Sequence, residues 1–330
     1  MKPLTRIIVL SIVAVLLVAV IFVGIKVWDR GVFSLNLGIR SSYFYNDSEK
    51  YTLGGAELTG ELTDLDINWV SGSVNIVAGD GDKIIISETS SNGDIEDNYK
   101  LRYLFEDGKL TIKYQKSGLI KRIFDDSQKA LVLTIPAAYL DSMDDVEIDV
   151  VSANLNIGTI KCSTMNIDNV SGLITAADIS GDRADFCSVS GEIKVETLNF
   201  SKINIKTVSS DISIKDSSVS DKLTVDTTSG KIIVNTSNVN YFDCDTISGE
   251  INCNFTNCPV EMDIESISGN VDVEIPDNDG FALTFDSASG DININGFATT
   301  KESDKYIYKI KDAEFDFETI SGDFSLSLVN

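Results

Sequence analysis

The chain has 330 residues, 43% of them hydrophobic, which is enough to bury a core. It contains 51 acidic against 27 basic residues, and this balance argues against a nucleic acid or an anionic lipid as partner, because both are bound through Lys and Arg. No histidine is present, so catalysis of the Ser-His-Asp type is excluded and zinc loses its commonest ligand.

A hydrophobic segment near the N-terminus predicts a membrane anchor. Residues 7–25 contain no charge, are flanked by Lys and Arg, and have the length of a bilayer span. The segment lacks a small-residue cleavage site, which favours an uncleaved anchor over a signal peptide. We therefore expect a cytoplasmic tail at 1–6, a transmembrane helix at 7–27, a linker at 28–56 and an extracytoplasmic domain at 57–330.

The segment 80–136 has the pattern of antiparallel strands. Three stretches rich in Ile, Leu, Val and Tyr, "KIIISET", "KLRYLFEDGKLTIKYQ" and "KALVLTIP", are separated by polar residues. Asp107 and Gly108 have the composition of a hairpin turn within the second stretch. We expect this insertion to cover the N-terminal side of the repeats that follow.

A Ser, usually followed by Gly, recurs through the rest of the chain at intervals of 19 to 21 residues. Its positions in the array are Ser152, Ser171, Ser190, Ser209, Ser229, Ser248, Ser268 and Ser289. Ser71 and Ser321 have the same surroundings, but insertions at 80–136 and 296–313 separate them from the array. A fixed period of this length is typical of solenoid proteins, and it predicts about ten turns.

An alignment on the recurring Ser predicts which positions of each turn are buried. The residues six and four before the Ser, and those three and five after it, are apolar in all eight turns of the array. The residue directly before the Ser is usually Val or Ile, and we assign it to the interior as well. This alternation has the period of a β-strand. We therefore predict an all-β fold, a parallel β-solenoid with about 19–20 residues per turn.

The recurring Gly is predicted to be a structural corner of each turn. The corner glycines are Gly172, Gly191, Gly230, Gly249, Gly269 and Gly290. They fall in the inward series, where a missing Cβ lets the chain bend over a packed interior. Recurrence in nearly every turn favours this structural role over a catalytic site. The adjacent Ser is expected to face outward or into the corner and to hydrogen-bond between turns.

Carboxylates form the most conspicuous polar pattern. Asp226, Asp245, Glu265 and Asp286 stand three residues before the Ser in four consecutive turns, and we call this set the acidic stripe. Each neighbouring pair costs about 0.9 kcal/mol before salt screening, which is too little to require a cation. The glycine-rich signature of calcium-binding β-rolls is absent. The five cysteines are irregularly spaced, with Cys187 in an outward position, so we expect no metal and no cofactor.

The segment 320–330, "ISGDFSLSLVN", is predicted to form the last turn of the solenoid. Phe324 and Leu326 continue the inward columns, and no further cap follows them in the sequence. This strand should therefore pair on one side only and leave free N–H and C=O groups on the other. We take Phe324, Leu326 and Ser327 as a candidate docking edge for another protein or a second copy, unless the 296–313 insertion covers it.

The turns with the pattern "VSG-x-I-x-V", the "DGKLTIKY" hairpin and "LVLTIP" resemble the bacterial putative-adhesin family of domains of unknown function, which includes LiaG-like envelope proteins. The resemblance covers roughly residues 57 to 330. It implies a right-handed parallel β-solenoid behind one membrane span on the bacterial cell envelope. It implies no catalytic residues.

We expect a non-enzymatic protein: an adhesin-like binding or scaffold module of the bacterial cell envelope, anchored in the cytoplasmic membrane, or an accessory to envelope-stress signalling. Its partners would be an envelope protein or a cell-wall ligand, with self-association through a solenoid end. Two alternatives stay open. Some parallel β-solenoids are polysaccharide lyases or hydrolases that use carboxylates, and others are self-assembling structural proteins.

Overall fold

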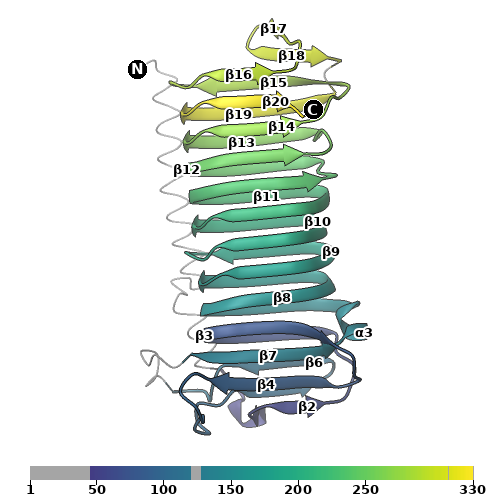
Figure 1. The fold of residues 1–330 in the computed structure, drawn as a ribbon, viewed down its shortest axis with the longest axis vertical. Coiled ribbons are helices and arrows are strands. Elements are labelled where there is room, and N and C mark those ends of the chain that lie inside the picture. The colour runs from purple at the N-terminus through teal and green to yellow at the C-terminus, as the bar shows by residue number, and fades with distance from the viewer. Residues whose placement is uncertain (1–44, 120–127, 311, 330) are drawn as a thin grey trace.

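The computed structural model describes residues 45–119, 128–310 and 312–329. Within these ranges the chain is mostly β, and Figure 1 shows one long stack of largely parallel strands. The predicted tail at 1–6 and the predicted anchor at 7–27 lie outside the described residues. Among the residues described, no helix is long and apolar enough to cross a membrane.

The elements fall into three groups along the chain. The N-terminal group comprises η1 (Ser48–Lys50), β1 (Thr52–Leu53), β2 (Ala56–Leu58), β3 (Asp64–Gly79), β4 (Ile84–Ser90), β5 (Arg102–Glu106), β6 (Lys109–Lys113), β7 (Lys129–Pro136) and α3 (Ala137–Leu140). The middle group comprises β8 (Met143–Ser171), β9 (Ile174–Ser188), β10 (Ile193–Ser209), β11 (Ile212–Ser237), β12 (Tyr241–Phe255), β13 (Glu261–Ser268) and β14 (Val271–Ile275). The C-terminal group comprises β15 (Gly280–Ser287), β16 (Ile292–Asn295), β17 (Thr300–Glu302), β18 (Lys305–Lys309), β19 (Ala313–Ser321) and β20 (Phe324–Leu328).

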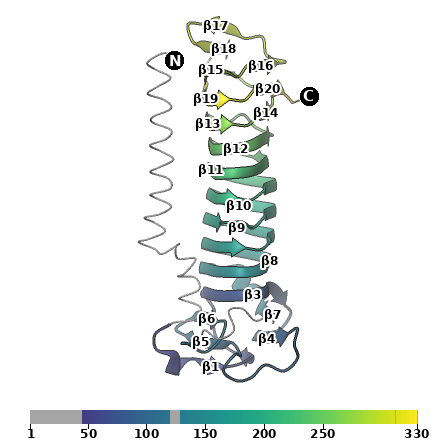
Figure 2. The ribbon, with the colours of Figure 1, turned by 90° about the vertical axis from the view of Figure 1, so that its left-hand side faces the viewer.

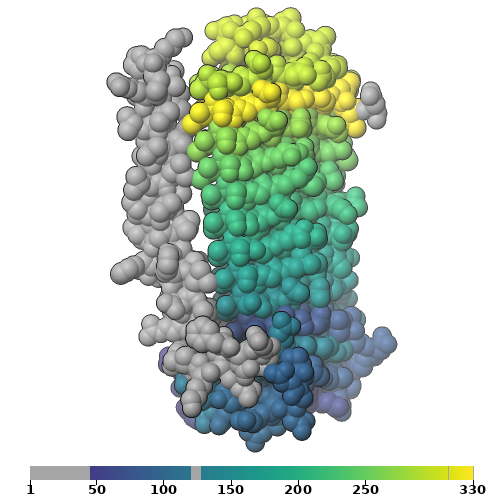
Figure 3. All heavy atoms as spheres, turned by 60° about the vertical axis from the view of Figure 1, so that its left-hand side comes forward, coloured from purple at the N-terminus to yellow at the C-terminus, as the bar shows by residue number. Residues whose placement is uncertain are grey.

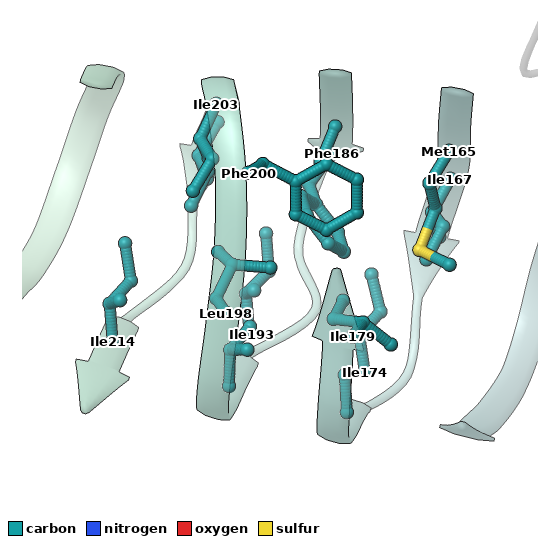
Figure 4. Close-up of a cluster of buried hydrophobic side chains, with 14 of the residues drawn as sticks. Met165, Ile167, Ile174, Ile179, Phe186, Ile193, Leu198, Phe200, Ile203 and Ile214 are labelled. Atoms are coloured by element: carbon teal, nitrogen blue, oxygen red, sulfur yellow. The ribbon is translucent and has the colours of Figure 1, made fainter. Parts of the chain in front are cut away.

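Neighbouring turns from β8 to β12 pair in parallel, and their register equals the sequence repeat. Ile193, for example, lies beside Ile174 of the preceding turn and Ile212 of the next. Figure 4 shows such side chains from successive turns packed together in the interior. The columns four before and three after the Ser are almost completely buried in these turns. Each fully buried Ile, Leu or Phe contributes about 1.5–3 kcal/mol to stability. The parallel pairing and the burial of these columns confirm the predicted all-β, largely parallel core.

The phase of the alternation at the corner differs from our prediction. The residue directly before the Ser is not inward: Val208 is 39% exposed, and Val151, Val170 and Val189 are only partly buried. The buried position is the one before it, two residues ahead of the Ser. There the side chains are small and polar in six successive turns, namely Asn169, Ser188, Thr207, Thr227, Thr246 and Ser266. The strand alternation therefore continues without a slip to this position, and the chain bends after it.

Three of the buried polar side chains, Asn169, Ser188 and Ser266, close the corner by bonding to the glycine that follows. The hydroxyl of Ser188 accepts a hydrogen bond from the N–H of Gly191 at 3.0 Å, and the amide of Asn169 donates to the carbonyl of Gly172 at 2.9 Å. Side chains of this kind stabilise turns by replacing a backbone partner. Thr227 bonds instead to the carbonyl of Ser229 at 3.0 Å, whereas the hydroxyls of Thr207 and Thr246 are buried without a hydrogen-bond partner among the described residues, which is a cost of burial at these two positions.

The glycines are required for a different reason from the one we predicted. A Cβ atom at Gly249 would lie 2.3 Å from the carbonyl oxygen of Gly230 in the preceding turn. The same clash, with a backbone oxygen of the adjacent turn, would occur at the other corner glycines, Gly172, Gly191, Gly230, Gly269 and Gly290. The limiting contact is thus between the backbones of stacked turns and not with the packed interior.

The recurring Ser hydroxyls bridge neighbouring turns. Ser190 donates to the carbonyl of Val170 at 3.2 Å, and Ser171 donates to the carbonyl of Val151 at 3.3 Å. The partner is a backbone carbonyl one turn away. The recurring Ser therefore adds a hydrogen bond between turns at the outer side of the corner.

At the N-terminal end, the outermost turn comes from the 80–136 insertion. β6 and β7 pair in parallel with the first and second halves of β3, opposite β8. β5 covers β6 and β4 covers β7, both in antiparallel pairing, and β1 and β2 add further strands. Residues 45–56, which we assigned to the linker, belong to this cap: the Tyr45 hydroxyl donates to the carbonyl of Gln115 at 3.0 Å.

At the other end, the order of turns in space departs from their order in the chain. β19 and β20 lie between the turn of β13 and β14 and the turn of β15 and β16, as Figure 1 shows. In the space-filling view of Figure 3, the yellow atoms of these last strands lie below a further layer from the preceding segment. The outermost elements are therefore β15, β16 and the hairpin of β17 and β18, seen at the top of Figure 2.

Candidate interaction surfaces

The acidic stripe lies on the outer face of the strands that precede the corner. Asp226, Asp245 and Glu265 are partners in adjacent strands. Because β19 is inserted, Glu318 stands between Glu265 and Asp286, which the sequence order had made neighbours. The stripe is thus continuous but contains one more carboxylate than we predicted.

Further carboxylates lie on the same face, five and seven residues before the recurring Ser. Glu314 and Asp316 of β19 lie beside Glu261 and Asp263 of β13, so that two "E-x-D-x-E" sequences are paired in register. Asp243 of β12 lies beside Asp263 and extends the column five residues before the Ser. We call this surface the acidic face; its members are Asp226, Asp243, Asp245, Glu261, Asp263, Glu265, Asp286, Glu314, Asp316 and Glu318.

The crowding of like charges perturbs the titration of this face. Desolvation, together with the neighbouring Asp226 and Glu265, raises the pKa of Asp245 to about 7. Desolvation and adjacent carboxylates likewise raise the pKa of Asp263 to about 6. Desolvation also raises the pKa of Glu318, with Glu265 adding to the effect.

Three lysines partly compensate the acidic face. Lys206 contacts Asp226 at 2.8 Å, and Lys222 contacts Asp243 at 2.7 Å. Lys305 of the terminal hairpin contacts Glu314 at 2.9 Å. In the described part of the chain, no group of three or more acidic or Cys side chains is arranged to hold a metal ion.

The predicted docking edge is wrong. Phe324 and Leu326 are buried at 2% and 0% exposure, and β20 has a parallel partner on each side. Ser327 lies between Glu274 of β14 and Asn295 of β16. The residues that do end the stack belong to β16, which pairs with β20 and with no second strand among the residues described.

A buried lysine lies between the N-terminal cap and the stack. The Lys129 side chain is 5% exposed and donates to Glu88, to the carbonyl of Tyr114 and to the carbonyl of Tyr99. Its ammonium also lies over the rings of Tyr114 and Trp69. Burial lowers the pKa of Lys129 to about 8, against the attraction of Glu88. A cavity of about 80 Å³ adjoins it, but the three donors of the ammonium are already engaged.

The cysteines are free thiols in the interior or near it. Cys244 and Cys253 are buried in the core as their columns predict, and Cys187, which we expected to be exposed, is largely covered. Burial and the neighbouring Asp168 raise the pKa of the Cys187 thiol to about 12. These thiols are therefore poor nucleophiles at neutral pH.

Two features escaped the prediction from sequence. The buried polar column was visible as a position that is small and polar in nearly every turn, and it could have been found by aligning polar as well as apolar residues. The insertion of β19 left a weaker signal. The stretch "EFDFETIS" at 314–321 resembles "EMDIESIS" at 261–268 more closely than the intervening turn does, and these two stretches are the ones that pair.

The arrangement defines a mostly-β protein built around a long, largely parallel sheet. A family model described as Toastrack DUF4097 matches residues 62–327, so the chain belongs to this family of domains of unknown function and the predicted resemblance is confirmed. A search of curated proteins finds no match. Among solved structures, a "putative cell adhesion protein from Clostridium sporogenes" is 16% identical, with a TM-score of 0.22, and the match covers 84% of this chain and 100% of that one.

Proposed function

We propose that the protein is a non-catalytic, adhesin-like binding or scaffold module of the bacterial cell envelope. In this proposal residues 7–27 anchor it in the cytoplasmic membrane and the right-handed stack stands outside. The acidic face supports a binding role. Stacked repeats present long surfaces to extended partners, and adjacent carboxylates weaken a fold, so a purely structural role does not account for ten of them on one face.

The topology can be tested with a cysteine placed on the exposed outer side of a corner. Thr228 is exposed and stands directly before Ser229. The full-length Thr228→Cys chain, treated with a membrane-impermeant maleimide on intact, wall-stripped cells, should be labelled. The unsubstituted chain is the control, because its described thiols are covered and the thiol of Cys187 has a raised pKa. Labelling that appears only after lysis would reverse the orientation.

One observation keeps the carbohydrate-active alternative in view. Asp245, with its pKa raised to about 7, lies between two carboxylates in adjacent strands, and glycosidases pair a protonated with an ionised carboxyl group. Release of reducing sugars from cell-wall or plant polysaccharide by the full-length chain, abolished in Asp245→Asn, would establish this alternative and remove the non-catalytic proposal.

A further inference from the structure

The last turn of the stack is covered on one half only. β18 pairs with β15 from Gly280 to Thr284, and the Phe297 ring packs on Phe281 with centroids 5.3 Å apart. This cover stops before the corner. Neither Phe285–Ser287 nor β16 has a strand on its outer side among the residues described.

The uncovered half exposes apolar side chains that every other turn buries. Ile292 and Ile294 are only partly buried, and so is Phe285 across the core from them. Their counterparts in the adjacent turn, Phe324 and Leu326, are at 2% and 0% exposure. We call Phe285, Ile292, Ile294 and the outer edge of β16 the open end.

The open end also carries unpaired backbone groups. Phe324 donates its N–H to the carbonyl of Asp291 at 2.8 Å, which fixes the side of β16 that faces β20. In a parallel ladder the backbone groups of successive residues point to alternate sides. Asp291 and Asn293 thus face β20, whereas the N–H and C=O groups of Ile292 and Ile294 face outward and can accept another strand.

The charge around the open end is negative and uncompensated. Asp286 and Asp291 flank the last corner, both are exposed, and neither forms an ion pair within the described residues. Asp323 of the adjacent turn is also exposed and accepts from the N–H of Asp291 at 3.1 Å. Two lysines of the terminal hairpin are engaged elsewhere: Lys305 with Glu314 and Lys309 with Asp277.

We propose that the open end binds an extended segment of a partner protein by strand addition, and that this segment alternates apolar residues with Lys or Arg. Its backbone pairs with β16, its apolar side chains cover Ile292 and Ile294, and its basic side chains meet Asp286 and Asp291. A second copy is disfavoured, because it brings the same carboxylates and a formal net charge of -24. This inference deepens the proposed binding role and rests on it.

The test uses the full-length chain, purified in detergent, and a fluorescent capped peptide in which Lys and Ile alternate over about seven residues. An isomorphous Glu and Ile peptide is the charge control. We expect the basic peptide to bind and the acidic one not to. Ile294→Pro removes an outward N–H and should weaken binding at least about tenfold, whereas Ile294→Val, which keeps the N–H, should stay within about twofold.

A second variant decides the matter even if Ile294→Pro fails to fold. Asp291→Lys should weaken binding of the basic peptide and narrow its preference over the acidic one, because only Asp286 is left to meet the basic side chains. The matched control is Asp216→Asn, an exposed charge on β11 that leaves the open end unchanged. Equal binding by Ile294→Pro and Ile294→Val, or an unchanged preference in Asp291→Lys, overturns the proposal.

Dimers that form at micromolar concentration and vanish in Ile294→Pro would make a second copy the occupant, and this too overturns the assigned partner. The peptide measurement does not depend on membrane topology. If the basic peptide does not bind, the proposed envelope role is unaffected. If Thr228→Cys is labelled only after lysis, that role is removed, but strand addition is not.

Discussion

At the N-terminal end of the stack both halves of the outermost turn have an antiparallel neighbour, β5 on β6 and β4 on β7, whereas at the far end only β15 is covered. Both ends are built in the same way. The outermost turn is not the one at the end of the chain's repeats: β6 and β7 lie outside β3, and β15 and β16 lie outside β19 and β20.

The difference in cover decides how well similar side chains are buried. Leu110 and Leu131 in the outermost N-terminal turn are fully buried, but Ile292 and Ile294 in the outermost turn of the far end are not. All four are branched aliphatic side chains of equal size, so the strand that covers the turn makes the difference. In a stack, where each turn contacts only its neighbours, the half-covered end should unfold locally before the middle or the N-terminal end.

The largest effect is expected in the middle turns, which are the reference for both ends. Gly249→Val places a branched side chain where even a Cβ would lie 2.3 Å from the Gly230 oxygen, and it should lower the free energy of unfolding by about 4 kcal/mol or more. Gly81→Val is the control, because a Cβ there meets no atom closer than 3.9 Å. Equal urea midpoints for the two variants would contradict the close approach of stacked backbones.

Breaking the buried ion pair between Lys129 and Glu88 should destabilise the N-terminal cap. Lys129→Met leaves the Glu88 carboxylate, 4% exposed, without its cation, and this should cost about 3–5 kcal/mol in the free energy of unfolding. Lys215→Met, on an exposed lysine 3.8 Å from Glu196, should change it by about 0.5 kcal/mol or less. Denaturant melts of both variants make the comparison; matching losses would show that Lys129 does not hold the cap in place.

Covered and open turns can be compared by shortening the Ile three residues after the recurring Ser in one turn of each kind. Ile174→Ala in the middle removes a side chain at 0% exposure and should cost about 3 kcal/mol. Ile292→Ala at the open end removes a partly buried side chain and should cost about 1 kcal/mol. Thermal unfolding measures both, and a loss at Ile292 as large as that at Ile174 would mean that the end is covered in solution.

Much of the fold was predictable because stacked turns repeat one physical requirement. The columns represented by Ile193 and Ile205 are apolar in every turn, and they predicted the core and the parallel register. Two things were not. The direction of Val208 was assigned from its apolar character, although the polar Thr207 before it is the buried residue. A small polar side chain at a tight corner is buried because of its place in the strand alternation, which hydrophobicity does not reveal.

The spatial order of the turns was the other failure, and the candidate docking edge failed with it. A 19-residue period says that turns stack, but not that consecutive turns are neighbours. The segment from β15 to β18 forms the outermost layer, and β19 and β20 pair with the inner side of β15 and β16. Phe324 is therefore enclosed, and Ile292 lies at the end of the stack. The predicted acidic stripe is still continuous, because β19 carries outward carboxylates at the same positions.

The smallest predicted effect concerns the acidic face, and its sign follows from the pKa shifts. An unfolded Asp titrates near 3.9, whereas the folded pKa is about 7 for Asp245 and about 6 for Asp263. Between these values the folded state binds more protons, so stability falls as pH rises. Asp185, whose pKa is lowered chiefly by its bonds to Arg183 and Asn204 against desolvation, loses its contribution only below about pH 4. The pKa of Lys129 is lowered to about 8 by burial, above the range between the two Asp values, so it contributes little to this slope.

We therefore expect a higher melting temperature at pH 5 than at pH 8. Asp245→Asn should raise the melting temperature by about 1–2 °C at pH 8, where the wild-type carboxylate is charged, and leave it nearly unchanged at pH 5, where that carboxyl is already neutral. The effect is small because the face is largely exposed and screened by salt. Asp216→Asn, outside the acidic face, should show no such pH dependence. An Asp245→Asn chain that melts lower than wild type at pH 8 would mean that this carboxylate is held by a favourable partner, and the acidic face would then be a stabilised feature of the stack.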